Sequence, residues 1–112
     1  MSEVLKFADR AEFREWLQEN CLSSAGVWLL FGKAGGPKTV KAGEALEEAL
    51  CFGWIDGRMK SIDDKTYQKY FSMRREKSRW SEKNKVLAMS LEERGLMTDH
   101  GRKKMEEARK NG

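Results

Sequence analysis

"WIDGRMKSIDDKTYQKYFSM", residues 54–73, contains two segments that favour β-strands, 54–62 and 66–73. The three residues between them, Asp63–Lys65, are all polar. Two strand-like segments joined by a short polar turn are typical of a β-hairpin, so the sequence predicts one here. We expect this hairpin to form part of a small antiparallel sheet.

Side chains alternate between the two faces of a strand. In the first half of the hairpin, alternation assigns one face to Trp54, Asp56, Arg58 and Lys60. It assigns the opposite face to Ile55 and Met59. We therefore expect Asp56 and Arg58 to lie side by side.

The residues before the hairpin predict two more strands and two helices. The expected elements are a short strand at 4–7, a helix at 10–20, a strand at 27–31 and a helix at 41–52. Asp9 is a suitable N-cap for the first helix. The uninterrupted apolar run Val27–Phe31 predicts a central strand buried on both faces. Gly53 suits the left-handed position that ends the second helix.

Two further helices are expected after the hairpin. Ser81 is an N-cap for a helix over residues 82–94, and Thr98 is one for a helix over 99–110. Strands and helices intermixed in this way predict an α+β fold. We expect a single domain over residues 1–112, in which a mostly antiparallel sheet of about three or four strands packs with about four helices.

Composition excludes several classes of protein. Hydrophobic residues make up 39% of the chain and charged residues 36%, as in soluble globular proteins. The longest apolar run is too short to span a bilayer, and no secretory signal is visible, so we expect a cytoplasmic protein. The chain has two cysteines and one histidine, and it has neither a CxxC pair nor a phosphate-binding glycine loop. We therefore expect neither a metal site nor a cofactor.

The net charge of +4 is unevenly distributed. Between Arg58 and Lys85 there are ten Lys or Arg residues against four Asp or Glu residues. A local excess of cations favours an anionic ligand or an acidic partner.

Three segments together resemble the YdeI/OmpD-associated family, also called bacteriocin-protection proteins. They are "EALEEALCFGWIDGRMKSIDD" (44–64), "YFSMRREKSRWSEKN" (70–84) and "ERGLMTDHG" (93–101). The resemblance implies a bacterial protein with a role in bacteriocin or stress resistance, in a family that is largely uncharacterised. Met73 and Glu76 stand where that family has prolines. Its members generally continue into a C-terminal helical extension, which we expect to be absent here.

Residues 54–58 supply the first candidate site. Arg58 would hold an anionic ligand that Asp56 orients, or Asp56 would act as a base. Trp54 would offer an aromatic platform beside the guanidinium. The alternative is a structural ion pair next to a core tryptophan.

The basic segment "RREKSRWSEKN", residues 74–84, supplies the second candidate site. Guanidinium groups and hydroxyls next to a helix N-terminus can bind a phosphate or another anion. The expected ligand-binding residues there are Arg74, Lys77, Ser78, Trp80 and Asn84. A capped helix start accounts equally well for Ser81, Trp80 and Asn84.

Three functions follow from these patterns. The first is a non-catalytic domain that binds a small anionic or phosphorylated ligand, or an acidic protein partner, through a basic surface containing tryptophan. The second is a small enzyme with Asp56 as acid or base. Cys51 is not expected to be its nucleophile, because it lacks a histidine in its vicinity, and we expect it to be structural. The third is a weak nucleic-acid binder in which Tyr67, Tyr70, Phe71 and Trp80 supply stacking. The sequence favours the first.

Overall fold

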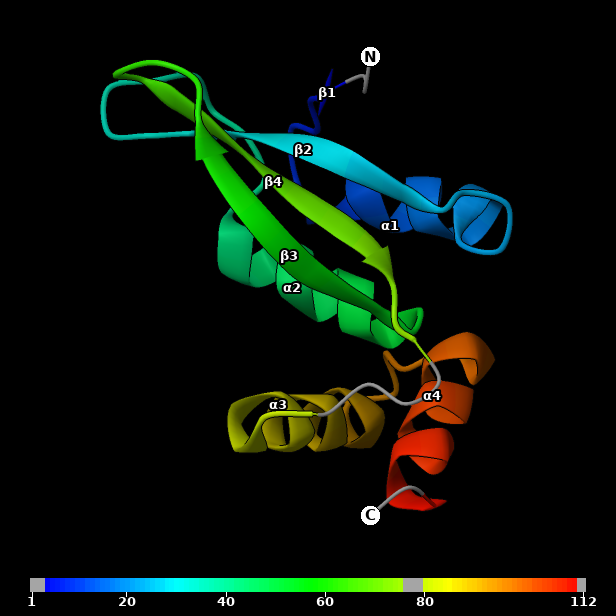
Figure 1. The fold of residues 1–112 in the computed structure, drawn as a ribbon. Coiled ribbons are helices and arrows are strands. Elements are labelled where there is room, and N and C mark those ends of the chain that lie inside the picture. Colours follow the sequence, from blue (N-terminus) through cyan, green and yellow to red (C-terminus); the bar gives the residue numbers. More distant parts are fainter. Residues whose placement is uncertain (1–3, 76–79, 111–112) are drawn as a thin grey trace.

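The computed structural model describes residues 4–75 and 80–110. It has an α+β fold (Figure 1). The strands are β1 (Val4–Leu5), β2 (Gly26–Gly32), β3 (Trp54–Ser61) and β4 (Thr66–Met73). The helices are α1 (Arg10–Asn20), α2 (Ala42–Cys51), α3 (Glu82–Glu93) and α4 (Asp99–Lys110). The fold class expected from the sequence is confirmed.

The four strands form one sheet in the order β1-β2-β4-β3. The predicted hairpin is present, because β3 pairs antiparallel with β4. β4 also pairs antiparallel with β2, whereas the short β1 runs parallel to β2. Two of the three strand pairings are therefore antiparallel, as expected for a mostly antiparallel sheet.

Helix ends match the local signals in the sequence. The side chains of Asp9 and Ser81 accept hydrogen bonds from the backbone N–H groups of Glu12 and Asn84, at the starts of α1 and α3. Gly53 follows α2 with a φ of 77°, in the left-handed region where glycine is favoured. Caps depend only on near neighbours in the chain, which is why they can be predicted.

Helices α1 and α2 cover one face of the sheet, and α3 and α4 pack beyond α2 (Figure 1). The core lies between these helices and the sheet. It includes Phe13 and Leu17 of α1, Leu29 of β2, Leu50 of α2 and Phe71 of β4, all with no exposed surface. Among the described elements, no helix covers the opposite face of the sheet (Figure 1).

The prediction that β2 would be buried on both faces is therefore wrong. Val27, Leu29 and Phe31 are buried, but Trp28 and Leu30 between them are only half-buried. The apolar run predicts cover on both faces of the strand, but α1 and α2 lie on the same side of the sheet. We call the uncovered side the open face.

The prediction that Trp54, Asp56, Arg58 and Lys60 share a face is also wrong. The pairing of β3 with β4 shifts between Asp56, which is opposite Phe71, and Met59, which is opposite Lys69. This β-bulge places Gly57 and Arg58 together opposite Tyr70 and reverses the alternation that follows. Trp54 and Asp56 consequently face the helices, while Arg58 and Lys60 lie on the open face with Tyr70.

Candidate functional site

The first predicted site does not assemble as one constellation. Trp54 is fully buried, and its indole N–H donates a hydrogen bond of 3.1 Å to the carbonyl oxygen of Cys21. Its ring packs edge-to-face on Trp16, with the centroids 5.7 Å apart. Asp56 pairs with Lys69 across the hairpin, at 2.9 Å between Oδ2 and Nζ. Exposed Arg58 lies on the other side of the sheet.

Arg74 and Trp80, from the second predicted site, are in contact. The guanidinium carbon of Arg74 lies 3.8 Å from the centroid of the Trp80 ring. Only 3% of Arg74 is exposed, and burial lowers its pKa to about 10, against the opposing attraction of the Asp56 carboxylate. Arg74 therefore remains cationic at neutral pH, but its guanidinium is shielded from solvent by its stack on Trp80.

The remaining residues of that segment divide into two groups. Lys77 and Ser78 lie outside the residues that the structure describes. Asn84 is at the third position of α3, where its backbone N–H is held by the Ser81 cap at 3.1 Å. The geometry of the described part thus joins Asp56, Lys69, Arg74 and Trp80 in one charged and aromatic cluster at the end of the hairpin.

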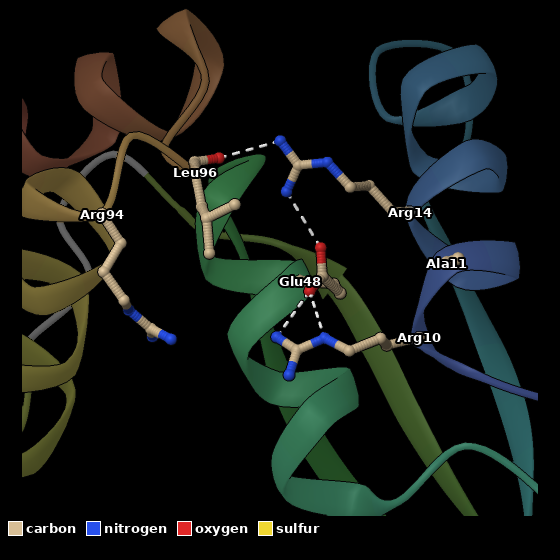
Figure 2. Close-up of a pocket in the computed structure, with 6 residues that line it drawn as sticks. All are labelled: Arg10, Ala11, Arg14, Glu48, Arg94 and Leu96. Carbon is tan, nitrogen blue, oxygen red and sulfur yellow. Dashed lines mark hydrogen bonds and ion pairs between the residues drawn. The ribbon is translucent and has the colours of Figure 1, made fainter.

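A network of arginines that the sequence did not suggest lies between the helices (Figure 2). Glu48 of α2 is 4% exposed and accepts hydrogen bonds from Arg10 at 2.7 Å and from Arg14 at 2.9 Å. Arg14 also donates to the carbonyl oxygen of Leu96, at 2.9 Å. Figure 2 shows the two α1 arginines reaching the Glu48 carboxylate from one side.

These groups line a pocket of about 250 Å³. Arg94 reaches it from the end of α3 and lies 3.7 Å from Glu47. A hydrogen bond to Glu47 raises the pKa of Arg10, although burial opposes the rise. Burial is the largest effect on the pKa of Arg14 and lowers it, but the interactions with Glu48 and Cys51 together outweigh burial, so the net shift is upward. The arginines here form hydrogen bonds and ion pairs with Glu47 and Glu48. The network therefore serves mainly to join α1 to α2 and to the segment after α3.

Glu48 could have been noticed in the sequence. It lies three residues after Ala45 and one before Ala49, on the packed face of α2. A charged residue on such a face needs a partner. The identity of the partners could not be predicted, because Arg10 and Arg14 are 38 and 34 residues away along the chain.

Cys51 is placed as expected for a structural residue. Cys51 has no exposed surface, and burial raises the pKa of its thiol, with the neighbouring Arg14 offsetting part of the rise. His100 is exposed in the first turn of α4. Within the described residues there is no cluster of three or more His, Cys, Asp or Glu side chains able to hold a metal ion.

The open face combines aromatic and charged side chains. It carries two aromatic rings, Trp28 and Tyr70, whose centroids are 5.2 Å apart on neighbouring strands. The ammonium of Lys60 lies 5.4 Å from the centroid of the Trp28 ring. Other side chains that the strand register assigns to this face are Val4, Leu30, Ile55, Thr66, Gln68 and Ser72. The bulge opposite Tyr70 adds the exposed Arg58.

Tyr70 occupies a defined position on this face. A Cβ added to Gly26 would overlap the Tyr70 hydroxyl, so the ring extends across the neighbouring strand above a residue without a side chain. The ring therefore lies along the sheet and approaches Trp28 at an angle of 52° between planes. Only glycine at position 26 leaves room for this arrangement.

The charge on the open face is of one sign. Among the described strand residues that the register places there, Arg58 and Lys60 are cationic and none is acidic. Both cations are exposed. The face thus combines two half-buried aromatic rings, Trp28 and Tyr70, with two exposed cations.

Comparison with known proteins gives one match. Residues 5–104 match the family model described as "Domain of unknown function (DUF8412)". No curated protein and no solved structure matches the chain. The matched region runs from the second residue of β1 into α4, so it includes the arginine network and the open face apart from Val4.

Proposed function

The chain belongs to the DUF8412 family, and we propose that it is a non-catalytic binding domain that holds an anionic partner on the open face of its sheet. The observation that carries the proposal is the uncovered pair Trp28 and Tyr70, flanked by Arg58 and Lys60. Apolar surface left uncovered by a folded domain marks interaction sites. Exposed cations beside such a surface favour a partner of negative charge.

The charge of the whole protein supports the same choice. A net charge of +4 attracts anions over distances of about 10 Å at moderate ionic strength. Within contact range, Arg58 offers a planar fork of donors and Lys60 a compact ammonium. A neutral partner would leave both cations partly desolvated without compensation.

The ion pair between Asp56 and Lys69 supports a binding role over a catalytic one. The Asp56 carboxylate is engaged by the Lys69 ammonium at 2.9 Å, so a structural contact already occupies it. Asp56 also faces the helices, away from the aromatic pair. A structural role, which fixes the hairpin and attracts Arg74, accounts for it.

The broader assignments belong to the same proposal. We place the action of the domain in the cytoplasm, and we propose kinship with the YdeI/OmpD-associated proteins and a role in bacteriocin or stress resistance, as the resemblance implies. Within the part of the chain that the structure describes, no helix has the length and apolar character that a bilayer crossing requires.

The proposal is tested by reversing the charge of two residues on the open face and, separately, of two residues elsewhere. Arg58→Glu/Lys60→Glu changes two exposed strand residues, and Lys103→Glu/Lys110→Glu changes two exposed residues of α4. Both variants alter the net charge equally. Binding to fluorescent polyglutamate and to heparin would be measured by anisotropy at low salt.

Wild type and the α4 variant are expected to bind, while the open-face variant loses at least about tenfold in affinity, or roughly 1.4 kcal/mol. Equal losses in the two variants would mean that only bulk charge matters, and the open face would lose its role. Absence of binding to every polyanion would end the proposal.

A further inference from the structure

We infer that the anionic partner of the open face is a single-stranded nucleic acid, whose bases stack on Trp28 and Tyr70 and whose phosphates contact Arg58 and Lys60. The inference rests on the proposed function and narrows its partner to one chemical class. A site for single strands requires two things together, exposed aromatic rings and cations that follow the backbone. The open face supplies both.

The two rings are arranged as a platform. They lie on neighbouring strands with centroids 5.2 Å apart, and both are partly exposed. Tyr70 extends across Gly26 instead of standing upright, which turns a face of its ring away from the sheet. Successive bases can therefore meet successive rings without unfolding any part of the sheet.

The ammonium of Lys60 can change its contact partner when a nucleic acid binds. In the free protein its ammonium lies over the Trp28 ring at 5.4 Å. A cation–π contact at an exposed site is weaker than the stacking of one base on an aromatic side chain. A base that takes the ring therefore displaces the ammonium, which becomes available to the adjacent phosphate.

The other candidates for this surface fit less well. In a duplex the base faces are stacked on one another, so the rings would contribute nothing. An acidic peptide matches the cations but brings no planar rings. A second copy of the chain would bring the same two cations and, from the described strand residues of its open face, no carboxylate.

The test uses the whole chain and three fluorescent polyanions. These are an oligothymidylate of roughly 12 nucleotides, the corresponding duplex, and polyglutamate. Anisotropy titrations would be made at several salt concentrations on wild type, Trp28→Phe, Trp28→Leu and Tyr70→Leu. Lys60→Gln would be compared with Lys103→Gln, an exposed lysine of α4. Circular dichroism would check that each variant is folded.

Wild type is expected to bind the oligothymidylate more tightly than the duplex. Trp28→Leu and Tyr70→Leu should each weaken binding by roughly 5- to 150-fold, and Trp28→Phe by less, because it keeps a ring. Lys60→Gln should reduce the slope of log K against log salt by about 0.7, whereas Lys103→Gln leaves it unchanged.

Each contrary result has a separate meaning. Binding of polyglutamate without binding of the oligothymidylate would overturn this inference and leave the proposed function standing. Failure of all probes would end both. Folded Trp28→Leu and Tyr70→Leu variants that bind as well as wild type would overturn the stacking platform, and equal or tighter binding of the duplex would overturn the preference for single strands.

Discussion

Gly53 connects α2 to β3 in a backbone conformation that glycine adopts at little cost. Its φ is 77°, and a Cβ there would come within 3.0 Å of the carbonyl oxygen of His100. The glycine thus ends the helix and also lets the start of α4 approach it. One residue sets both the turn of the chain and the position of a helix distant in sequence.

Gly53→Ala is expected to lower the free energy of unfolding by about 2 kcal/mol, because alanine is strained at positive φ and collides with α4. Urea denaturation measures the loss. Gly43→Ala is the matched control, since a Cβ there meets nothing within 4 Å and the position is helical. The control should gain about 0.5–1 kcal/mol. Equal effects of the two substitutions would contradict this account of Gly53.

At the scale of elements, the hairpin turn is stabilised by one carboxylate. Asp63 accepts hydrogen bonds from the backbone N–H of Lys65 at 2.9 Å and of Thr66 at 2.8 Å, and from the Thr66 hydroxyl at 2.8 Å. The hydrogen bond from the Lys65 backbone N–H lowers the pKa of Asp63 most, and the hydrogen bond from the Thr66 hydroxyl has the next largest effect. The turn therefore depends on the ionised form.

This dependence predicts a stability that changes with pH. Because the pKa of Asp63 is lower in the folded protein, its contribution is complete above the unfolded pKa of about 3.9 and is lost as pH falls through the folded pKa. The difference in unfolding free energy between wild type and Asp63→Asn should be present at pH 7 and should shrink in this acid range. When both proteins also carry Thr66→Val, which removes one hydrogen-bond donor to Asp63, the difference between them should be smaller. A difference that does not vary with pH would exclude the mechanism.

Helices α1 and α2 are joined through Glu48, whose side chain is only 5% exposed (Figure 2). Glu48→Gln would leave Arg10 and Arg14 without their shared carboxylate. We expect a loss of about 2 kcal/mol, less than for a deeply buried pair, because the two arginine side chains are 34% and 26% exposed.

Thermal and urea unfolding would measure this loss. The control is Glu82→Gln, which breaks the surface pair with Lys85 at 3.3 Å. A surface pair contributes at most about 1 kcal/mol, so the control should change little. If the two variants were equally stable, the network would have no role in joining the helices.

Across the whole molecule, the decisive feature is that α1 and α2 both lie on the same side of the sheet (Figure 1). Consecutive strands and helices build one core on that side, and none of the described helices covers the other side. The binding proposals belong to this scale, because they depend on a face that no individual element defines. The same arrangement places two tryptophans of similar local character in different roles, with Trp54 in the core and Trp28 on the surface.

Much of the fold could be predicted from residues close together in the chain. The caps at Asp9 and Ser81 and the hairpin follow from local hydrogen bonding and backbone preference. The packed face of α3 shows the limit of such signals. Val86 is apolar but 65% exposed, whereas Ala88 and Leu91 are buried. Helical periodicity identifies a stripe, but the neighbouring elements determine which part of the stripe is covered.

The sequence alone determined the types and order of the elements, their ends, and the concentration of basic residues in the middle of the chain. Only the tertiary structure decided which surface these residues form. The bulge at Gly57 and Arg58 moved Arg58 and Lys60 to the open face, and the strand order placed Trp28 beside Tyr70. The physical reason is that helix caps and turns depend on atoms a few residues apart, whereas the face that a side chain occupies depends on pairing register and on where distant helices pack.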